Sequence, residues 1–281
     1  MKCAWDMYLN LLPIPLRKSV DAYASTAQEV RLRVDQPVEV ITQTGSVWLN
    51  YIVTTDDLSF TVNIASRYSP WSSNTVPFGY ITAPGGHRVG ICGQAVMANG
   101  SIQGIRTVSS LCLRIARDYS GIALNAASLT GSILILGRPG SGKTTLLRDL
   151  IRTLSDKHTV AVIDEREELF PRTERSYCFP IGKKVDILSC CKKSEGIDRV
   201  LRTMNPEYIA VDEITAAEDC EGLLYAGWCG VKLLATAHAQ CRSDLFKRPV
   251  YKPLVDSGIF EHLLILRPDK TWKTERMNLC Y

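Results

Sequence analysis

The chain has 281 residues, of which 46% are hydrophobic and 22% are charged, an ordinary globular composition that excludes disordered, collagen-like and coiled-coil proteins. This length accommodates about two domains. The formal net charge is +4 and is spread evenly along the chain. No basic half marks a nucleic-acid-binding domain, so we do not expect nucleic acid as the main partner.

The cysteines and the N-terminal segment indicate the compartment. The ten cysteines form neither Cys-x-x-Cys pairs nor the Cys/His spacing of a zinc site, which predicts reduced thiols. The first residues include Asp6, Pro13 and Pro15 and lack the unbroken apolar core of a signal peptide. The longest uncharged stretch, residues 119–137, contains polar residues and glycines and does not predict a membrane span. We expect a cytoplasmic chain with at most peripheral membrane contact.

Short alternating segments in the first part of the chain predict β-strands. They span residues 29–34, 38–42, 46–49, 80–82, 88–96 and 109–115. The turn signal Ala83-Pro84-Gly85-Gly86 predicts a hairpin between two of them. Residues 56–67 carry a mixed helix and strand signal, with Asp56 as a candidate helix cap. We predict a small α+β domain over residues 1–120.

From residue 130 onward, short apolar runs alternate with segments of helical spacing. The apolar runs span residues 133–136, 159–163, 208–211, 231–235 and 263–266, and the helical segments span residues 144–154, 194–204 and 216–228. This alternation predicts an α/β domain with a parallel-rich sheet over residues 121–281, with the boundary between residues 118 and 130. In such sheets, ligands bind beyond the carboxyl ends of the strands.

One segment matches the phosphate-binding pattern G-x-x-x-x-G-K-[ST] at every specified position. It comprises Gly137, Arg138, Pro139, Gly140, Ser141, Gly142, Lys143 and Thr144, with Thr145 following in the helix. Backbone N–H groups of such a loop wrap around phosphate oxygens, and the helix directs its N-terminus at the same anion. We expect Lys143 to reach the β- and γ-phosphates and the Thr144 hydroxyl to bind Mg²⁺. A chance match in a glycine-rich turn is the alternative, and the flanking strand and helix disfavour it.

Two apolar strands end in carboxylate pairs, Asp212-Glu213 and Asp164-Glu165. An Asp at the end of a strand suits the Mg²⁺ partner of a P-loop nucleotide hydrolase, and the next Glu suits a residue that polarises the attacking water. We assign Asp212 to Mg²⁺ and Glu213 to the water. Glu165 helps to orient that water or replaces Glu213. The alternative is that either pair caps a helix or lies in a solvated turn.

A histidine follows the next strand, in Thr236-Ala237-His238. His238 could sense the γ-phosphate or hold Glu213 in place, because it falls beside the predicted site. A lone histidine at a strand end can equally be a structural hydrogen-bonding residue, and both readings stay open.

The order of these segments resembles the secretion-ATPase superfamily of type II and type IV systems. There, an aspartate box, a Walker B segment and a histidine box follow the P-loop. Asp164-Glu165-Arg166 stands in the first box, Asp212-Glu213 in the second and His238 in the third. The segment from residue 201 to residue 214 carries much of the resemblance.

Within this superfamily, the chain is most similar to the stage III sporulation protein AA family, from about residue 25 to residue 265. The similarity is carried by residues 85–90, 105–106, 113–117 and 162–166. One departure is visible: Thr215-Ala216-Ala217 stands where the family tends to have Gly and basic residues. A contact made there by a basic side chain is not expected in this chain.

The resemblance implies a RecA-like ATPase core behind the N-terminal domain, assembled as a hexameric ring with ATP and Mg²⁺ between subunits. Arginines of an N-terminal domain would complete the site, with Arg106 and Arg114 preferred over Arg88 and Arg117. Each arginine could instead be an ordinary exposed cation.

The resemblance also implies a cellular setting. The motor would power a channel between mother cell and forespore during endospore formation. It would dock on the inner face of the membrane, on the mother-cell side, against the membrane proteins of that complex.

Two other functions compete with an ATPase motor. One is a nucleic-acid-associated P-loop ATPase, which a salt-dependent interaction with single-stranded DNA would reveal. The other is a nucleotide-gated scaffold that binds ATP and hardly hydrolyses it. The candidate water-activating residues, Glu213 and Glu165, argue against the scaffold.

Overall fold

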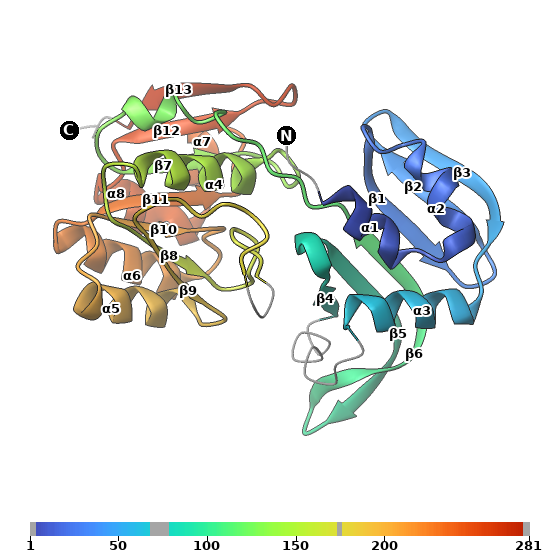
Figure 1. The fold of residues 1–281 in the computed structure, drawn as a ribbon. Coiled ribbons are helices and arrows are strands. Elements are labelled where there is room, and N and C mark those ends of the chain that lie inside the picture. Colours follow the sequence, from blue (N-terminus) through green and yellow to red (C-terminus); the bar gives the residue numbers. More distant parts are fainter. Residues whose placement is uncertain (1–3, 68–78, 173–175, 278–281) are drawn as a thin grey trace. The chain divides into compact units, whose positions relative to one another are not determined.

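The computed structural model describes residues 4–67, 79–172 and 176–277, drawn as a ribbon in Figure 1. The chain divides into two compact units. One comprises Met1–Asp118 and Thr173–Cys178, and the other comprises Tyr119–Arg172 and Phe179–Tyr281. Each unit has its own sheet and its own hydrophobic core.

The first unit is a six-stranded sheet in which all neighbours are antiparallel. In spatial order the strands are β3 (Gly45–Ile52), β2 (Pro37–Thr42), β1 (Ala27–Arg33), β6 (Ser101–Arg114), β5 (Arg88–Ala98) and β4 (Tyr80–Thr82). Its helices are α1 (Trp5–Leu11), α2 (Ile14–Asp21), α3 (Thr55–Ala65) and the short turn η2 (Pro84–Gly86). Apolar residues of α1, α2 and α3 share one core with alternate strand residues, so the helices cover one face of the sheet (Figure 1).

The ambiguous segment at residues 56–67 is helix α3. Its N-cap is Thr54 rather than Asp56: the Thr54 hydroxyl accepts the N–H of Asp57, and the Asp57 carboxylate accepts the N–H of Thr54. This reciprocal capping box decides the helix over the strand. The helices α1 and α2 were not predicted, and β6 begins well before the predicted segment 109–115.

The second unit is a seven-stranded sheet that is parallel except at one edge. In spatial order the strands are β13 (Trp272–Arg276), β12 (His262–Leu266), β7 (Ile133–Leu136), β11 (Lys232–Ala237), β10 (Tyr208–Val211), β8 (Val160–Asp164) and β9 (Val185–Ser189). Its helical segments are η3 (Ala126–Ser128), α4 (Lys143–Leu154), α5 (Lys193–Thr203), α6 (Ala217–Trp228), α7 (Arg242–Lys247), η4 (Pro249–Tyr251) and α8 (Lys252–Asp256). The predicted α/β class with a parallel-rich sheet, preceded along the chain by a small α+β region, is confirmed.

The parallel register gathers the residues of interest at one edge of this sheet. Val211 of β10 lies beside Ile163 of β8 on one side and Ala235 of β11 on the other, and Ala235 in turn lies beside Leu134 of β7. The loops that follow these four strands therefore begin side by side. Among the described residues, no helix is long and apolar enough to cross a membrane.

Candidate active site

The loop between β7 and α4 has the backbone of a phosphate cradle. Gly140 and Gly142 adopt positive φ angles of 72° and 104°, which favour glycine. At Gly137, a Cβ atom would come within 2.3 Å of the Ser141 hydroxyl and 3.2 Å of Lys143 Cγ, so a side chain there would displace the Ser141 side chain. Lys143 is buried and is the first residue of α4, so the loop leads directly into the N-terminus of this helix.

The Ser141 hydroxyl is a group of this loop that a bound anion would satisfy. It is buried and has no hydrogen-bond partner within the described part of the chain. A buried hydroxyl without a partner is costly, and an anion in the loop would satisfy it.

Asp212 accepts hydrogen bonds from two threonine side chains, one of them at the end of the loop. The Thr144 hydroxyl donates to Asp212 Oδ2 at 2.7 Å, and the Thr236 hydroxyl donates to Asp212 Oδ1 at 2.6 Å. Burial raises the pKa of Asp212, and these two hydrogen bonds oppose the rise. Thr236 was not predicted as a site residue, although it stands two residues before His238 at the end of β11.

Glu213, the residue after Asp212, is held in an unusual backbone conformation. Its φ of 55° lies in the left-handed region, which is costly for a residue with a side chain. Its N–H donates to the Thr236 hydroxyl at 2.7 Å. Thr236 thus fixes both members of the Asp212-Glu213 pair.

His238 connects Glu213 to the P-loop lysine. Lys143 Nζ lies 3.1 Å from His238 Nδ1 and donates to the Arg138 carbonyl at 3.1 Å. An ammonium group can only donate, so Nδ1 is the acceptor and the ring proton is assigned to Nε2. Nε2 then donates to Glu213 Oε1 at 2.8 Å. Burial lowers the pKa of Lys143, and Asp212 and Glu213 oppose that change.

The other carboxylate pair has different partners. Asp164 accepts the N–H groups of Glu168 and Phe170 at 2.9 and 2.8 Å, and burial raises its pKa to about 6. Glu165 Oε2 pairs with Lys193 Nζ at 2.5 Å. Asp164 therefore anchors its own loop, and Glu165 is engaged by a buried lysine that sequence reasoning did not single out.

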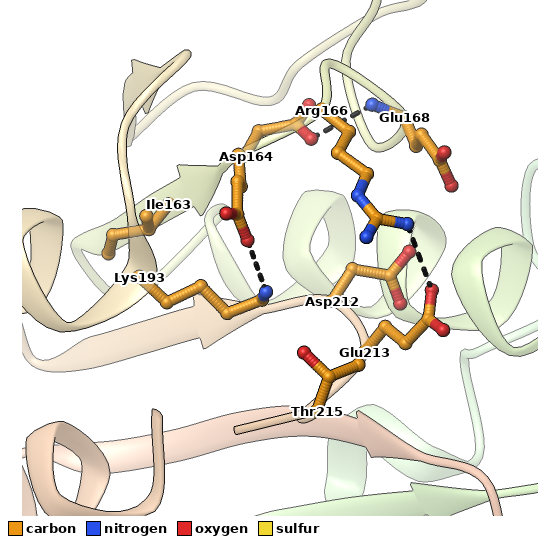
Figure 2. A pocket seen from close by; sticks show the side chains of 9 residues that line it. Ile163, Asp164, Arg166, Glu168, Lys193, Asp212, Glu213 and Thr215 are labelled. Atoms are coloured by element: carbon orange, nitrogen blue, oxygen red, sulfur yellow. Dashed lines mark hydrogen bonds and ion pairs between the residues drawn. The ribbon is translucent and has the colours of Figure 1, made fainter. Parts of the chain in front are cut away.

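A small cavity lies between the two carboxylate pairs, and Figure 2 shows its lining. It is formed by Ile163, Asp164, Glu165, Arg166, Glu168, Lys193, Asp212, Glu213 and Thr215. Arg166 extends across it, with Nη1 3.9 Å from Glu213 Oε2. The structure therefore brings both predicted acidic pairs to one cavity.

The residues fit a hard divalent cation held partly by a substrate. The Thr144 hydroxyl and the Asp212 carboxylate are oxygen donors 2.7 Å apart. Among the described residues, no cluster of three or more His, Cys, Asp or Glu side chains could hold a metal alone. Mg²⁺ typically takes one or two protein oxygens together with waters and phosphate oxygens, so Thr144 and Asp212 are the residues that would hold it.

The four candidate arginines lie in the first unit. Arg88 stacks over the Tyr80 ring at 3.8 Å, and Arg117 donates to the carbonyls of Ala24 and Ala27; both have structural partners. Arg106 and Arg114 lie on β6 and are exposed. The predicted contribution of these arginines to the nucleotide site stays a prediction.

Arg106 stands at an irregularity of β6. Thr107 pairs with Gln94 and Ile105 pairs with Ala95, so the register passes over Arg106. Such a bulge re-aims the side chain of the extra residue.

Comparison with known sequences places the chain among sporulation proteins. A family model described as "Sporulation stage III, protein AA" matches residues 7–276. Stage III sporulation protein AA of Bacillus subtilis (strain 168) is 37% identical over 252 residues, which cover 85% of this chain and 82% of that protein. Protein SEEDLING PLASTID DEVELOPMENT 1 of Arabidopsis thaliana is 25% identical over 260 residues, covering 89% of this chain and 36% of that protein.

Solved structures share the fold at low sequence identity. The ATPase DotB of Legionella pneumophila superposes with a TM-score of 0.60 and 16% identity, covering 94% of this chain and 80% of that chain. The pilus retraction motor PilT with bound ADP superposes with a TM-score of 0.61 and 19% identity, covering 91% and 78%. The predicted RecA-like fold is confirmed by these likenesses. The family model matches residues 7–276, which is most of this chain, so the chain belongs to the sporulation stage III, protein AA family.

Proposed function

We propose that the second unit is a Mg²⁺-dependent ATPase. One observation carries the proposal: the P-loop Thr144 hydroxyl meets the Asp212 carboxylate at 2.7 Å, directly beside Glu213 and the buried Lys143. A phosphate cradle, a cation-binding pair and a carboxylate base at one sheet edge are the parts that phosphoryl transfer to water requires.

We assign each residue of the site a separate role in ATP hydrolysis. Backbone N–H groups of residues 137–144 and the Lys143 ammonium hold the β- and γ-phosphates. When Mg²⁺ is bound, it neutralises charge on those phosphates. Glu213 polarises the attacking water. His238, which donates to Glu213 Oε1 at 2.8 Å, holds that carboxylate in place.

We further propose that this ATPase is the motor of a sporulation channel. Membership of the sporulation family and the fold shared with a pilus retraction motor support this role. The motor would be a hexameric ring, with Arg106 and Arg114 of one subunit serving the nucleotide of the next. It would act in the cytoplasm at the inner face of the membrane, on the mother-cell side, against membrane proteins of the channel.

The test is ATP turnover and light-scattering mass measured on the same samples, with and without Mg²⁺ and ATP. We expect Mg²⁺-dependent turnover that rises with protein concentration as a multimer forms. Lys143→Ala should weaken ATP binding by about 100-fold, because it removes the ammonium from the phosphates. A monomer whose specific activity does not change with concentration would contradict the shared site. Wild-type protein that binds no ATP would contradict the function itself.

A second candidate is a nucleotide-gated scaffold with little hydrolysis. It is favoured by the engagement of both Glu213 oxygens, one by His238 and the other by Arg166, which leaves the carboxylate poorly placed to activate water. ATP binding without turnover by the assembled protein would select this candidate.

A further inference from the structure

Arg166 is the half-exposed cation of the cavity between the two carboxylate pairs. The loop that carries Arg166 is held by hydrogen bonds, because the Asp164 carboxylate accepts the N–H groups of Glu168 and Phe170. The Arg166 side chain is 54% exposed and reaches across the cavity toward Glu213 (Figure 2). The loop is therefore hydrogen-bonded close to Arg166, whereas about half of the Arg166 side chain is open to solvent.

The contact that Arg166 makes is weak and exchangeable. Its Nη1 lies 3.9 Å from Glu213 Oε2, at the limit of an ion pair, and solvent screens it. Glu213 Oε1 is already bound by His238. With a cation at its second oxygen, the Glu213 carboxylate is a weaker acceptor for the proton of a water.

Lys193, the other cation that lines the cavity, does not make such an exchangeable contact. Its side chain is only 6% exposed and lies 2.5 Å from Glu165 and 3.7 Å from Asp219. Removing a buried ammonium from two carboxylates would leave unpaired buried charges. Lys193 therefore holds the cavity together, and Arg166 is the cation that can change partner.

We propose that Arg166 exchanges Glu213 for the γ-phosphate of the bound nucleotide. This inference rests on the proposed ATPase function. A phosphate oxygen pair matches the planar fork of a guanidinium and carries more charge than the Glu213 carboxylate. The exchange places a cation on the transferring phosphoryl group in cis and releases Glu213 to polarise the water. Arg166 is then a catalytic residue supplied by the same chain that holds the P-loop.

The experiment measures nucleotide affinity as well as turnover. Fluorescent ATP and ADP analogues are titrated against wild type, Arg166→Gln and Arg166→Lys, in EDTA and at a protein concentration too low for assembly. Arg202→Gln is the matched control, because Arg202 is an exposed arginine that pairs with Asp198 within α5.

We expect Arg166→Gln to bind the ADP analogue as wild type does and to bind the ATP analogue about tenfold more weakly. Its turnover under assembly conditions with Mg²⁺ should fall by about 100-fold or more. Arg166→Lys should recover part of the ATP preference, since it keeps the charge without the fork. Arg202→Gln should match wild type in every measurement.

Several outcomes would overturn the inference. One is wild-type turnover and ATP preference in both Arg166 variants. Another is an equal loss of ADP and ATP binding in both variants, which would mark a structural role. If the ATP preference of wild type appears only in the assembled protein, the responsible cation comes from another subunit. If wild type and Arg166→Gln hydrolyse ATP at similar rates, this inference is rejected and the proposed function stands. If wild type binds no ATP, the proposed function itself is rejected.

Discussion

Two neighbouring strands of the second unit end in the same Asp-Glu dipeptide, and the structure gives the two pairs different surroundings. Ile163 and Val211 lie side by side in the register of β8 and β10, so Asp164 and Asp212 occupy equivalent places. Asp212 receives two side-chain hydroxyls, one of them from the P-loop. Asp164 receives backbone N–H groups of its own loop. The hydrogen-bond partners, rather than the dipeptide sequence, therefore distinguish Asp164, which anchors its own loop, from Asp212, which belongs to the candidate site.

The glutamates differ in the same sense. Glu213 has a positive φ and contacts His238 and, more weakly, Arg166. Glu165 is locked against Lys193, which is nearly buried. Of the two, Glu213 is the carboxylate that can release a partner and face a water.

The largest difference should appear when each aspartate is made neutral. Asp212→Asn should lower ATP turnover by about 100-fold or more, because it removes the anionic oxygen donor beside Thr144. Asp164→Asn should keep turnover within about threefold and lower the free energy of unfolding instead, by about 1–3 kcal/mol, because an amide cannot accept both N–H groups. Steady-state turnover and chemical denaturation of the two variants measure these effects. Equal loss of turnover in both would contradict the distinction between the pairs.

The buried Asp164 should also leave a mark on the pH dependence of stability. Burial raises its pKa from 3.8 to about 6, so the folded state binds this proton more tightly than the unfolded state. The free energy of unfolding of wild type, relative to Asp164→Asn, should therefore fall as the pH rises from below about 4 to above about 6, by about 3 kcal/mol over the whole range and by about 2 kcal/mol between pH 4 and pH 6. Denaturation curves at several pH values measure the difference. A difference that rises over this range would show that the N–H groups dominate.

A smaller effect on the Asp212-Glu213 pair is expected from Thr236. Its hydroxyl donates to Asp212 and accepts the N–H of Glu213. Thr236→Val keeps the shape and removes both hydrogen bonds, so turnover should fall by about tenfold. Thr236→Ser should restore most of it. Turnover of the valine and serine variants at saturating ATP is the measurement, and equal rates in both would contradict a positioning role for the hydroxyl.

The smallest effect should come from Tyr251, a buried residue of η4. Its hydroxyl lies 3.3 Å from the backbone N–H of His238 and 3.3 Å from the carbonyl of Ile214. Tyr251→Phe removes these two long hydrogen bonds, which connect the segments carrying His238 and Glu213. We expect turnover to fall about threefold with little change in KM for ATP. A larger rise in KM than fall in kcat would indicate a binding role instead.

Much of the second unit could be predicted from the sequence, because its signals are local. Apolar runs mark the strands β7, β8, β10 and β11, and the glycine pattern marks the loop before α4. The contacts that distinguish the two Asp-Glu pairs join residues far apart in the chain. Thr236 meets Asp212 from the neighbouring strand β11, and Lys193 reaches Glu165 from helix α5. No spacing rule connects such residues, so these contacts required the structure.

The first unit was less predictable for a related reason. Its first helices, α1 and α2, are short and are separated by Pro13, which interrupts the helical period. The strand β6 contains three register shifts relative to β5, and each one breaks the alternation that predicts a strand.

The most direct test of the distinction between the pairs compares Glu213→Gln with Glu165→Gln in one experiment. Both variants are titrated with a fluorescent ATP analogue and then assayed for Mg²⁺-dependent turnover. We expect both to bind the analogue as wild type does, Glu213→Gln to lose at least about 100-fold in turnover, and Glu165→Gln to stay within about fivefold of wild type. Turnover near the wild-type rate in Glu213→Gln, with loss in Glu165→Gln, would reverse the assignment and contradict the account.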